Sequence, residues 1–275
     1  MIKHILAAVD GSPYTRGVGG WSRWLARKLD GELTALHVVD IVSLEGPFLH
    51  DLSGSLGFEP FLNFSAKMKE ALTSNGEAIL SSFKEECEQA GIACETSLSF
   101  GIVANEIAEK AKLGDLVVLG RRGVNARFDY GTLGSVAERV IRKSPVPVLV
   151  VEEEFREPER PLLCYDGSPN SAKVMHSAVE LVKELSLPIT VLTVAEEGEE
   201  LVKEAEEYIK PYDIEFECVV LEGDPPTTIE KFCREKGNDL VFMGASHHSR
   251  LVEMVLGSTA EYLVRNLSVA VFLEH

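Results

Sequence analysis

Apolar and polar positions along the chain follow two different periods. Short apolar runs have the length of buried strands, and the stretches between them repeat an apolar residue every three or four positions, as one face of a helix does. In the first half of the chain the predicted strands are residues 5–9, 33–39, 96–100, 116–119 and 146–151. Strands that alternate with helices predict an α/β fold, in which a parallel sheet is covered on both faces through right-handed crossovers.

Capping residues predict where the helices begin and end. Ser12 is expected to cap the first helix, with Pro13 at its first position and Gly31 at its end. Trp21 and Trp24 lie in this helix, and we interpret them as core or interface residues rather than as a ligand platform. Further helices are predicted at residues 68–91, 105–112 and 135–143.

Four blocks of sequence return later in the chain in the same order. Residues 9–13, 33–38, 115–120 and 134–138 match residues 165–169, 189–194, 239–244 and 257–261. The first block reads Val-Asp-Gly-Ser-Pro and returns as Tyr-Asp-Gly-Ser-Pro. An ordered repeat of this kind predicts two copies of one domain. We place them at residues 1–152 and 160–275, joined by a charged stretch that contains Pro158.

Charge and cysteine content narrow the class of protein. The net charge is −17, of which residues 1–150 carry −2 and residues 151–275 carry −15. This excess of negative charge disfavours nucleic acid and anionic membranes as partners, and no apolar run has the length of a membrane span. The five cysteines are odd in number and form no Cys-x-x-Cys pair, which favours reduced thiols in a cytoplasmic protein.

Glycines and polar residues follow the predicted strands of the first copy. Asp10 follows the first strand, and Gly120 and Gly123 follow the strand at 116–119. Glycines in such a position let backbone amides approach phosphate oxygens with no Cβ in the way. Gly134 and Ser135 open a predicted helix, whose N-terminus supplies free N–H groups and the positive end of the helix dipole. Since ligands bind beyond the carboxyl ends of parallel strands, these residues predict a phosphate site.

The spacing of these glycines resembles a motif of the universal stress protein family. Its nucleotide-binding members carry Gly-x-x-Gly, nine residues, and then Gly-Ser or Gly-Thr. The resemblance covers nearly the whole chain twice, so the chain is similar to a tandem member. It implies two Rossmann-like domains of the adenine nucleotide alpha-hydrolase type, each with a five-stranded parallel sheet. It further implies that the last strands, at residues 146–151 and 269–273, pair inside the chain, and it leaves a homodimer open.

The resemblance also implies a set of residues around an adenine nucleotide, ATP or AMP, with Mg²⁺ or Mn²⁺ as an accompanying ion. Asp10 would lie near the phosphates or their metal, although no metal site is expected from the protein alone, and Val38 would offer its backbone to adenine. The nucleotide-binding set in the first copy is Ala8, Val9, Asp10, Ser12, Val38, Leu119, Gly120, Arg122, Gly123, Gly134, Ser135 and Val136. The corresponding set in the second copy is Asp166, Val194, Gly244, His247, Gly257, Ser258 and Thr259.

Both copies depart from the family motif. Ten residues separate Gly123 from Gly134, one more than usual, which a loop can absorb by bulging. In the second copy the spacing is regular, but His247 stands in place of the second glycine, and its ring would crowd a phosphate. We therefore predict that the second site is weaker or empty. A metal site at His247 and His248 is disfavoured because side chains of neighbouring residues rarely converge.

No catalytic motif accompanies the predicted site. The sequence has no Gly-x-x-x-x-Gly-Lys-Ser/Thr loop, no Gly-x-Ser-x-Gly elbow and no His-Glu-x-x-His. The function predicted is therefore an adenine-nucleotide-responsive binding and regulatory module of the stress response, not an enzyme. Two alternatives stay open: a scaffold of the same fold that binds no nucleotide, and a slow ATPase. Residues 41–64, present only in the first copy, lack a helical period and are predicted to form a lid or partner contact near the first site.

Overall fold

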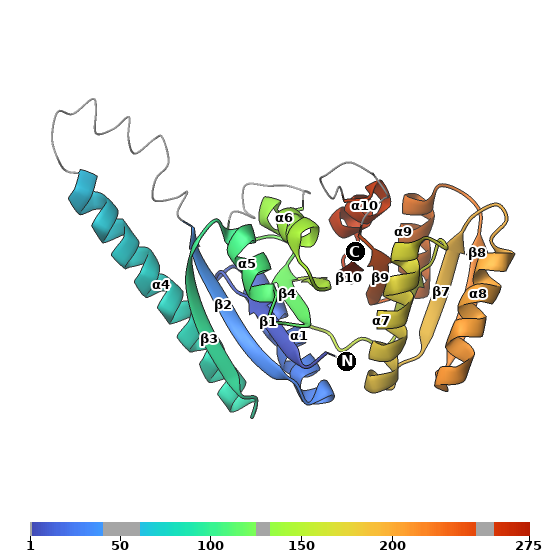
Figure 1. The fold of residues 1–275 in the computed structure, drawn as a ribbon, viewed down its shortest axis with the longest axis horizontal. Coiled ribbons are helices and arrows are strands. Elements are labelled where there is room, and N and C mark those ends of the chain that lie inside the picture. Colours follow the sequence, from blue (N-terminus) through green and yellow to red (C-terminus); the bar gives the residue numbers. More distant parts are fainter. Residues whose placement is uncertain (1, 41–60, 125–132, 246–255) are drawn as a thin grey trace.

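The chain forms one twisted sheet with helices on both faces (Figure 1). The computed structural model describes residues 2–40, 61–124, 133–245 and 256–275, with the backbone alone for residues 61–65. Within these ranges ten strands run in the order β3-β2-β1-β4-β5-β10-β9-β6-β7-β8. The strands are β1 (His4–Ala8), β2 (Glu32–Asp40), β3 (Cys94–Gly101), β4 (Leu116–Gly120), β5 (Val148–Val151), β6 (Pro161–Cys164), β7 (Ile189–Val194), β8 (Phe216–Leu221), β9 (Leu240–Gly244) and β10 (Ala270–Glu274). This confirms the predicted fold class of two tandem Rossmann-like halves.

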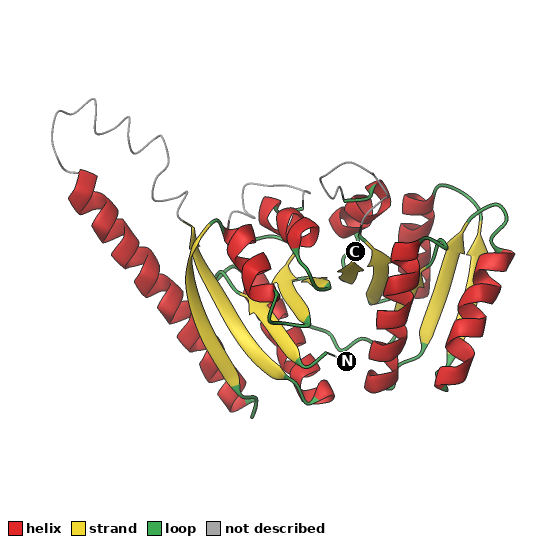
Figure 2. Cartoon of the chain, in the orientation of Figure 1, coloured by secondary structure: helices red, strands yellow, loops and turns green. Residues whose placement is uncertain are grey.

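The helices divide between the two faces of the sheet (Figure 2). One face is covered by α1, α4, α7 and α8, and the other by α5, α6, α9 and α10. The helices are α1 (Tyr14–Leu29), α4 (Phe61–Gln89), α5 (Val103–Ala111), α6 (Ser135–Lys143), α7 (Pro169–Leu185), α8 (Glu199–Ile209), α9 (Pro225–Lys236) and α10 (Ser258–Asn266), with a 3₁₀ turn η2 (Lys210–Tyr212). Each face has its own apolar core.

Alternation along the strands supplies both cores. In β1, Ile5 and Ala7 point to one face and Leu6 to the other, as the two-residue period of a strand requires. Each core contains buried residues from both halves of the chain. The two halves therefore share their hydrophobic interior.

The seam between the halves is the pairing of β5 with β10. These strands are antiparallel, with Val150 opposite Val271, whereas the other neighbours in the sheet are parallel. The predicted pairing of the last strands inside the chain is thus confirmed. Trp21 and Trp24 are buried beside Leu149 of β5 and Phe272 of β10, and Phe155 lies against the Trp21 ring with centroids 5.4 Å apart. Their interpretation as core or interface residues is confirmed as well.

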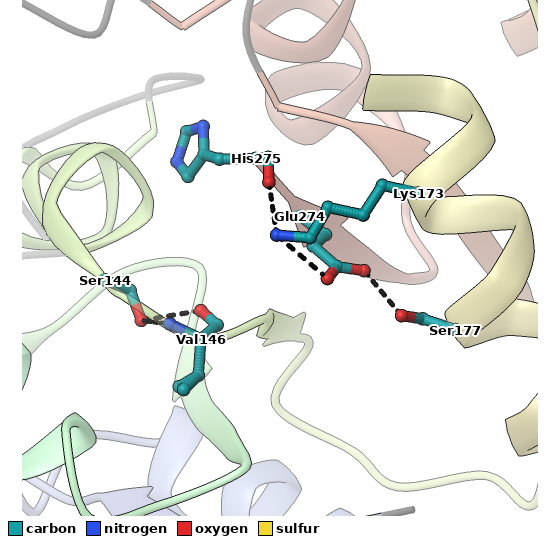
Figure 3. Close-up of polar contacts among 6 residues, drawn as sticks. All are labelled: Ser144, Val146, Lys173, Ser177, Glu274 and His275. Carbon is teal, nitrogen blue, oxygen red and sulfur yellow. Dashed lines mark hydrogen bonds and ion pairs between the residues drawn. The ribbon is translucent and has the colours of Figure 1, made fainter. Parts of the chain in front are cut away.

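Polar contacts hold the last strand to α7 (Figure 3). The carboxylate of Glu274 is buried at the end of β10, where Ser177 donates its hydroxyl at 2.6 Å and Lys173 Nζ lies at 3.4 Å. Lys173 also donates to the carbonyl of His275 at 2.7 Å. Between α6 and β5, Ser144 donates to the carbonyl of Val146 at 2.7 Å. These contacts fix the approach to β5 and the end of β10, the two strands that meet at the seam.

The predicted cap at Ser12 is wrong. Helix α1 begins at Tyr14 with Pro13 as its cap residue, and no side chain caps it. The helix begins one residue later than predicted, so Ser12 precedes the cap position. Its hydroxyl is buried and has no hydrogen-bond partner among the described residues, and its backbone N–H donates to Asp10. In the second half the same Ser-Pro pair does cap a helix, since Ser168 accepts from the backbone N–H of Ser171 at 3.1 Å.

Two further boundaries differ from the prediction. At the end of α1 the left-handed residue is Asp30, with a φ of 49°, and not Gly31. Helix α4 begins at Phe61, so the last four residues of the predicted lid segment 41–64 are helical. The phenylalanines in that segment gave no clear period because too few turns of helix fall within it. Residues 41–60, the rest of the predicted lid segment, lie outside the described part of the chain, so the lid prediction is not tested.

Candidate functional site

A cavity of about 370 Å³ lies at the carboxyl ends of β1, β2 and β4 in the first half. Its walls come from these strand ends, from the first turns of α1, α5 and α6, and from the middle of α4. The volume is within the range of small-molecule sites. Its position is where ligands bind in parallel α/β sheets, beyond the carboxyl ends of the strands.

The cavity brings together most of the residues predicted for the first site. Eleven of the twelve line it: Ala8, Val9, Asp10, Val38, Leu119, Gly120, Arg122, Gly123, Gly134, Ser135 and Val136. Ser12 is the exception: it lies in the loop that follows β1 and is buried. The loops that follow β1 and β4 are therefore close in space, as the topology of neighbouring strands β1 and β4 requires.

Asp10 connects these two loops. One carboxylate oxygen accepts from the backbone N–H of Ser12 at 3.0 Å, and the other accepts from the backbone N–H of Val124 at 2.9 Å. A Cβ on Gly123 would lie 2.6 Å from the second oxygen. Glycine at position 123 is therefore required for the loop after β4 to come within hydrogen-bond distance of Asp10.

The N-terminus of α6 faces the cavity. Gly134 is its cap residue and has no side chain to accept from the first N–H groups of the helix. The backbone N–H of Gly134 itself donates to the carbonyl of Arg121 at 3.0 Å, which holds this turn beside the loop after β4. Ser135 and Val136, in the first turn, line the cavity. Exposed N–H groups and the positive end of the helix dipole make this a place where an anion is stabilised.

The structure adds cavity residues that the sequence did not single out. They are Tyr14, Thr15, Val18, Leu36, His37, Val39, Asp40, Leu72, Asn75, Val103, Ile107, Val124 and Ala137. Leu72 and Asn75 come from α4, whose place over the cavity depends on tertiary packing that no local pattern reveals. The sequence could have indicated Tyr14 as a cavity residue, because it begins the helix that follows Asp10.

His37 is the buried polar side chain among these additions. Its Nδ1 lies 2.8 Å from the carbonyl of Val9. A carbonyl only accepts, so Nδ1 is the donor in this contact. Gly76 of α4 lies close to this ring, since a Cβ there would be 2.6 Å from the ring carbon Cδ2. The glycine lets α4 approach β2 at this point.

The buried Arg121 side chain joins the cavity loop to the second half. Arg121, next to the cavity residue Arg122, pairs with Glu152 at 2.6 Å and is 5% exposed. Its guanidinium also donates to the carbonyls of Arg265 and Val269, at 3.5 and 3.4 Å. Burial lowers the pKa of Arg121 and raises that of Glu152. Burial likewise raises the pKa of the nearby Tyr14 hydroxyl, and the charge of Glu152 adds to this.

The second half keeps part of this geometry. Asp166 accepts from the backbone N–H of Ser168 at 3.0 Å, as Asp10 does from Ser12. Gly257 caps α10 and donates to the carbonyl of Ala245 at 2.9 Å. Gly244 and Val194 end β9 and β7, and Ser258 and Thr259 begin α10. His247 lies outside the described residues, so its predicted effect on the second site is not tested.

Side chains at matching positions differ between the halves. Tyr165 stands where the first half has Val9, and it is buried. Thr193 stands where the first half has His37, and its hydroxyl donates to the carbonyl of Tyr165 at 2.9 Å, which replaces the histidine contact. Ala245 stands in place of Arg121. The link from a strand-end loop to the opposite half is thus made by Arg121 and has no counterpart at Ala245.

The described residues lack two further features. No three side chains among His, Cys, Asp and Glu gather there in an arrangement suited to a metal ion. None of the helices in those ranges combines the length and apolar character that crossing a bilayer demands.

Comparison with known proteins identifies the family. Residues 1–152 and 195–273 match the model of the universal stress protein family. A universal stress protein of Synechocystis is 28% identical over 283 residues, covering 98% of this chain and 99% of that protein. One from Methanocaldococcus jannaschii is 31% identical over 57% of this chain and 86% of its own length. A crystal structure of a universal stress protein from Archaeoglobus fulgidus superposes with a TM-score of 0.77 at 24% identity, covering 98% of this chain and 97% of that one. The chain belongs to the universal stress protein family.

Proposed function

We propose that the cavity of the first half binds an adenine nucleotide, and that the chain is a nucleotide-responsive binding protein. The observation that carries the proposal is the convergence of two phosphate-type elements on one cavity, namely the loop from Gly120 to Gly123 and the N-terminus of α6. Separately, each of these elements is common in proteins. Together, at the carboxyl edge of a parallel sheet, they form the kind of cradle that holds phosphate groups.

The apolar wall of the cavity suits a purine base. Val38 lies near the end of β2 and Leu119 near the end of β4, the strands on either side of β1. Val103 and Ile107 come from the first turns of α5. A flat ring placed against these side chains buries apolar surface, while strand-end backbone groups supply hydrogen bonds. Adenine rather than another base is proposed from the resemblance to the nucleotide-binding members of the family.

Asp10 is the residue proposed to lie nearest the phosphates. Its carboxylate fits a divalent cation that arrives with them, since Mg²⁺ in nucleotide sites is held by one or two carboxylates and by phosphate oxygens. Such an ion would neutralise the repulsion between the phosphates and Asp10. The protein residues would then position the anion through backbone N–H groups.

The second half is proposed to bind more weakly or not at all. Residues 151–275 carry −15 of the net charge of −17, which repels a polyphosphate at low ionic strength. Tyr165 also adds bulk where the first half has Val9. His247 remains the predicted obstacle at the position of the second glycine.

A matched pair of substitutions tests the proposal. Val136, in the first turn of α6, lines the cavity and is 37% exposed, and Thr259 has the same place in α10. Val136→Glu puts a carboxylate where a phosphate would lie, and Thr259→Glu makes the same change in the second half. Calorimetric titration with ATP and with AMP, with and without Mg²⁺, should show at least a tenfold loss of affinity, about 1.4 kcal/mol, in the first variant only.

Three outcomes would contradict the proposal. The unaltered chain fails to bind any adenine nucleotide, or both variants weaken binding equally, or Val136→Glu leaves the affinity unchanged. Circular dichroism of each variant shows that a lost affinity does not come from a lost fold. Phosphate release measured in the same samples separates simple binding from slow hydrolysis.

A further inference from the structure

Two cysteines meet at the end of α4 that lies away from the cavity. Cys87 is in the last turn of α4, and Cys94 is the first residue of β3. Their side chains are 0% and 8% exposed and belong to the same core. The chain reverses between them at Gly91, with a φ of 71°, and Ile92 donates to the carbonyl of Cys87 at 2.9 Å. This turn brings the two thiols close to one another, and Cys94 Sγ also donates to the carbonyl of Glu95 at 3.3 Å.

A guanidinium lies beside one of the two thiols. Arg23 of α1 pairs with Glu86 at 3.0 Å, lies 6.0 Å above the ring of Phe83, and hydrogen bonds to Cys87. The hydrogen bond from Cys94, together with the charge of Arg23, lowers the pKa of Cys87 despite its burial. The same hydrogen bond and burial raise the pKa of Cys94. Cys87 is therefore the more acidic thiol of the pair, and Cys94 the less acidic one.

We propose that Cys87 and Cys94 are a redox modification site that closes reversibly to a disulfide, with a hydroperoxide as oxidant. The Cys87 thiolate attacks one peroxide oxygen, so that an S–O bond forms, the O–O bond breaks, and the leaving hydroxide takes up a proton as water. The Cys94 thiol then loses its proton and attacks the sulfenic sulfur. An S–S bond forms, the S–O bond breaks, and a second water leaves. Hydrogen peroxide gains the two electrons that the two thiols lose.

The disulfide would tie the end of α4 to the edge strand β3. Both elements also contact β2, and α4 supplies Leu72 and Asn75 to the cavity wall. Neither cysteine lines the cavity, so the redox site stands independently of nucleotide binding. A thiol-specific dithiol reductant would reverse the modification by exchange.

Mass spectrometry of one peptide tests the proposal. Trypsin cleaves after Lys84 and Lys110, so a single peptide contains Cys87 and Cys94 and no other cysteine. The folded chain is treated with one equivalent of hydrogen peroxide, denatured, and alkylated with iodoacetamide. We expect the peptide to lose two hydrogen atoms and to carry no alkyl group, and dithiothreitol added before alkylation should restore both alkylated cysteines.

Two results would overturn the disulfide. Both cysteines remain alkylated after peroxide treatment, or the disulfide forms as fast in the urea-unfolded chain, where only closeness in sequence acts. Formation in the folded chain at a clearly higher rate supports the proposal, because the fold then brings the thiols together and activates one of them.

Arg23→Gln and Arg27→Gln form a matched pair for the activation step. Both arginines reach from α1 to the end of α4, but Arg27 donates to the carbonyl of Ala90 at 2.7 Å and is not among the groups that act on Cys87. Arg23→Gln should slow disulfide formation by about threefold for each unit by which the thiol pKa rises, because higher nucleophilicity partly offsets the lost thiolate. Arg27→Gln should react at the rate of the unaltered chain. Equal rates in all three proteins would refute the assignment of Cys87 as the attacking thiol.

Discussion

At the scale of single residues, the two halves use different side chains to form hydrogen bonds with equivalent backbone groups. The carbonyl after the first strand of each half is satisfied by His37 in one case and by Thr193 in the other. The repeat in sequence could predict that these positions correspond. It could not predict the contacts, because a histidine and a threonine share no sequence pattern. Each hydrogen bond also depends on the distance between the side chain and the end of the neighbouring strand.

Tyr165 gives a prediction about alkaline pH. Burial, with the charge of Glu204 nearby, raises its pKa to about 12, above the value near 10 of an unfolded tyrosine. The folded state therefore favours the neutral hydroxyl, so its contribution to stability is full below pH 10 and is lost as the pH rises through 12. Denaturant unfolding at pH 8 and pH 11 should show a smaller loss of unfolding free energy in Tyr165→Phe than in the unaltered chain. Equal losses would refute the pKa assignment.

At the scale of elements, the sequence predicted whether a segment is a helix or a strand better than it predicted where the segment begins and ends. The helix at residues 135–143 was predicted to the residue, since Gly134 and Ser135 mark its start. The beginning of α4 was missed because one helical turn at its start resembles a phenylalanine-rich loop. The cavity wall from α4 was missed for a different reason, since it depends on where the helix packs and not on its period.

The Ser-Pro pairs that precede α1 and α7 give a prediction about capping. Ser168 accepts from the N–H of Ser171, whereas the buried hydroxyl of Ser12 has no hydrogen-bond partner in the part of the chain that the structure describes. Ser168→Ala should lower the unfolding free energy by about 1 kcal/mol. Ser12→Ala should leave it unchanged or raise it, since it removes a buried hydroxyl that forms no bond. Thermal unfolding of both variants without nucleotide tests this, and an equal loss in the two would contradict it.

At the scale of the whole molecule, the seam makes one folding unit of two repeats. Both apolar cores extend across the β5–β10 pairing. Arg121, which forms an ion pair with Glu152, also donates across the pairing to carbonyls of the second half. We therefore expect a single cooperative unfolding transition. The fluorescence of Trp21 and Trp24, which lie at the seam, should change together with the helical signal in circular dichroism. Two separate transitions would show that the halves unfold independently and would contradict the shared interior.

The candidate site also depends on the whole molecule. Motif spacing predicted eleven cavity residues because strand ends of a parallel sheet meet at one edge. Ser12 was assigned to the site by its place in the motif, but the turn after β1 buries it. The link from Arg121 to the second half was outside the reach of sequence reasoning, since it requires the antiparallel seam that sets α10 and the start of β10 beside the cavity loop.

A crystal structure of the chain grown with ATP and Mg²⁺ tests the central claim most directly. The account predicts one nucleotide in the first half, with its phosphates between Asp10 and the N-terminus of α6 and its base against Val38. Little or no nucleotide should occupy the second half. Density for the nucleotide at Asp166 and Gly257 with the first cavity empty would contradict the account, and so would two equally occupied sites.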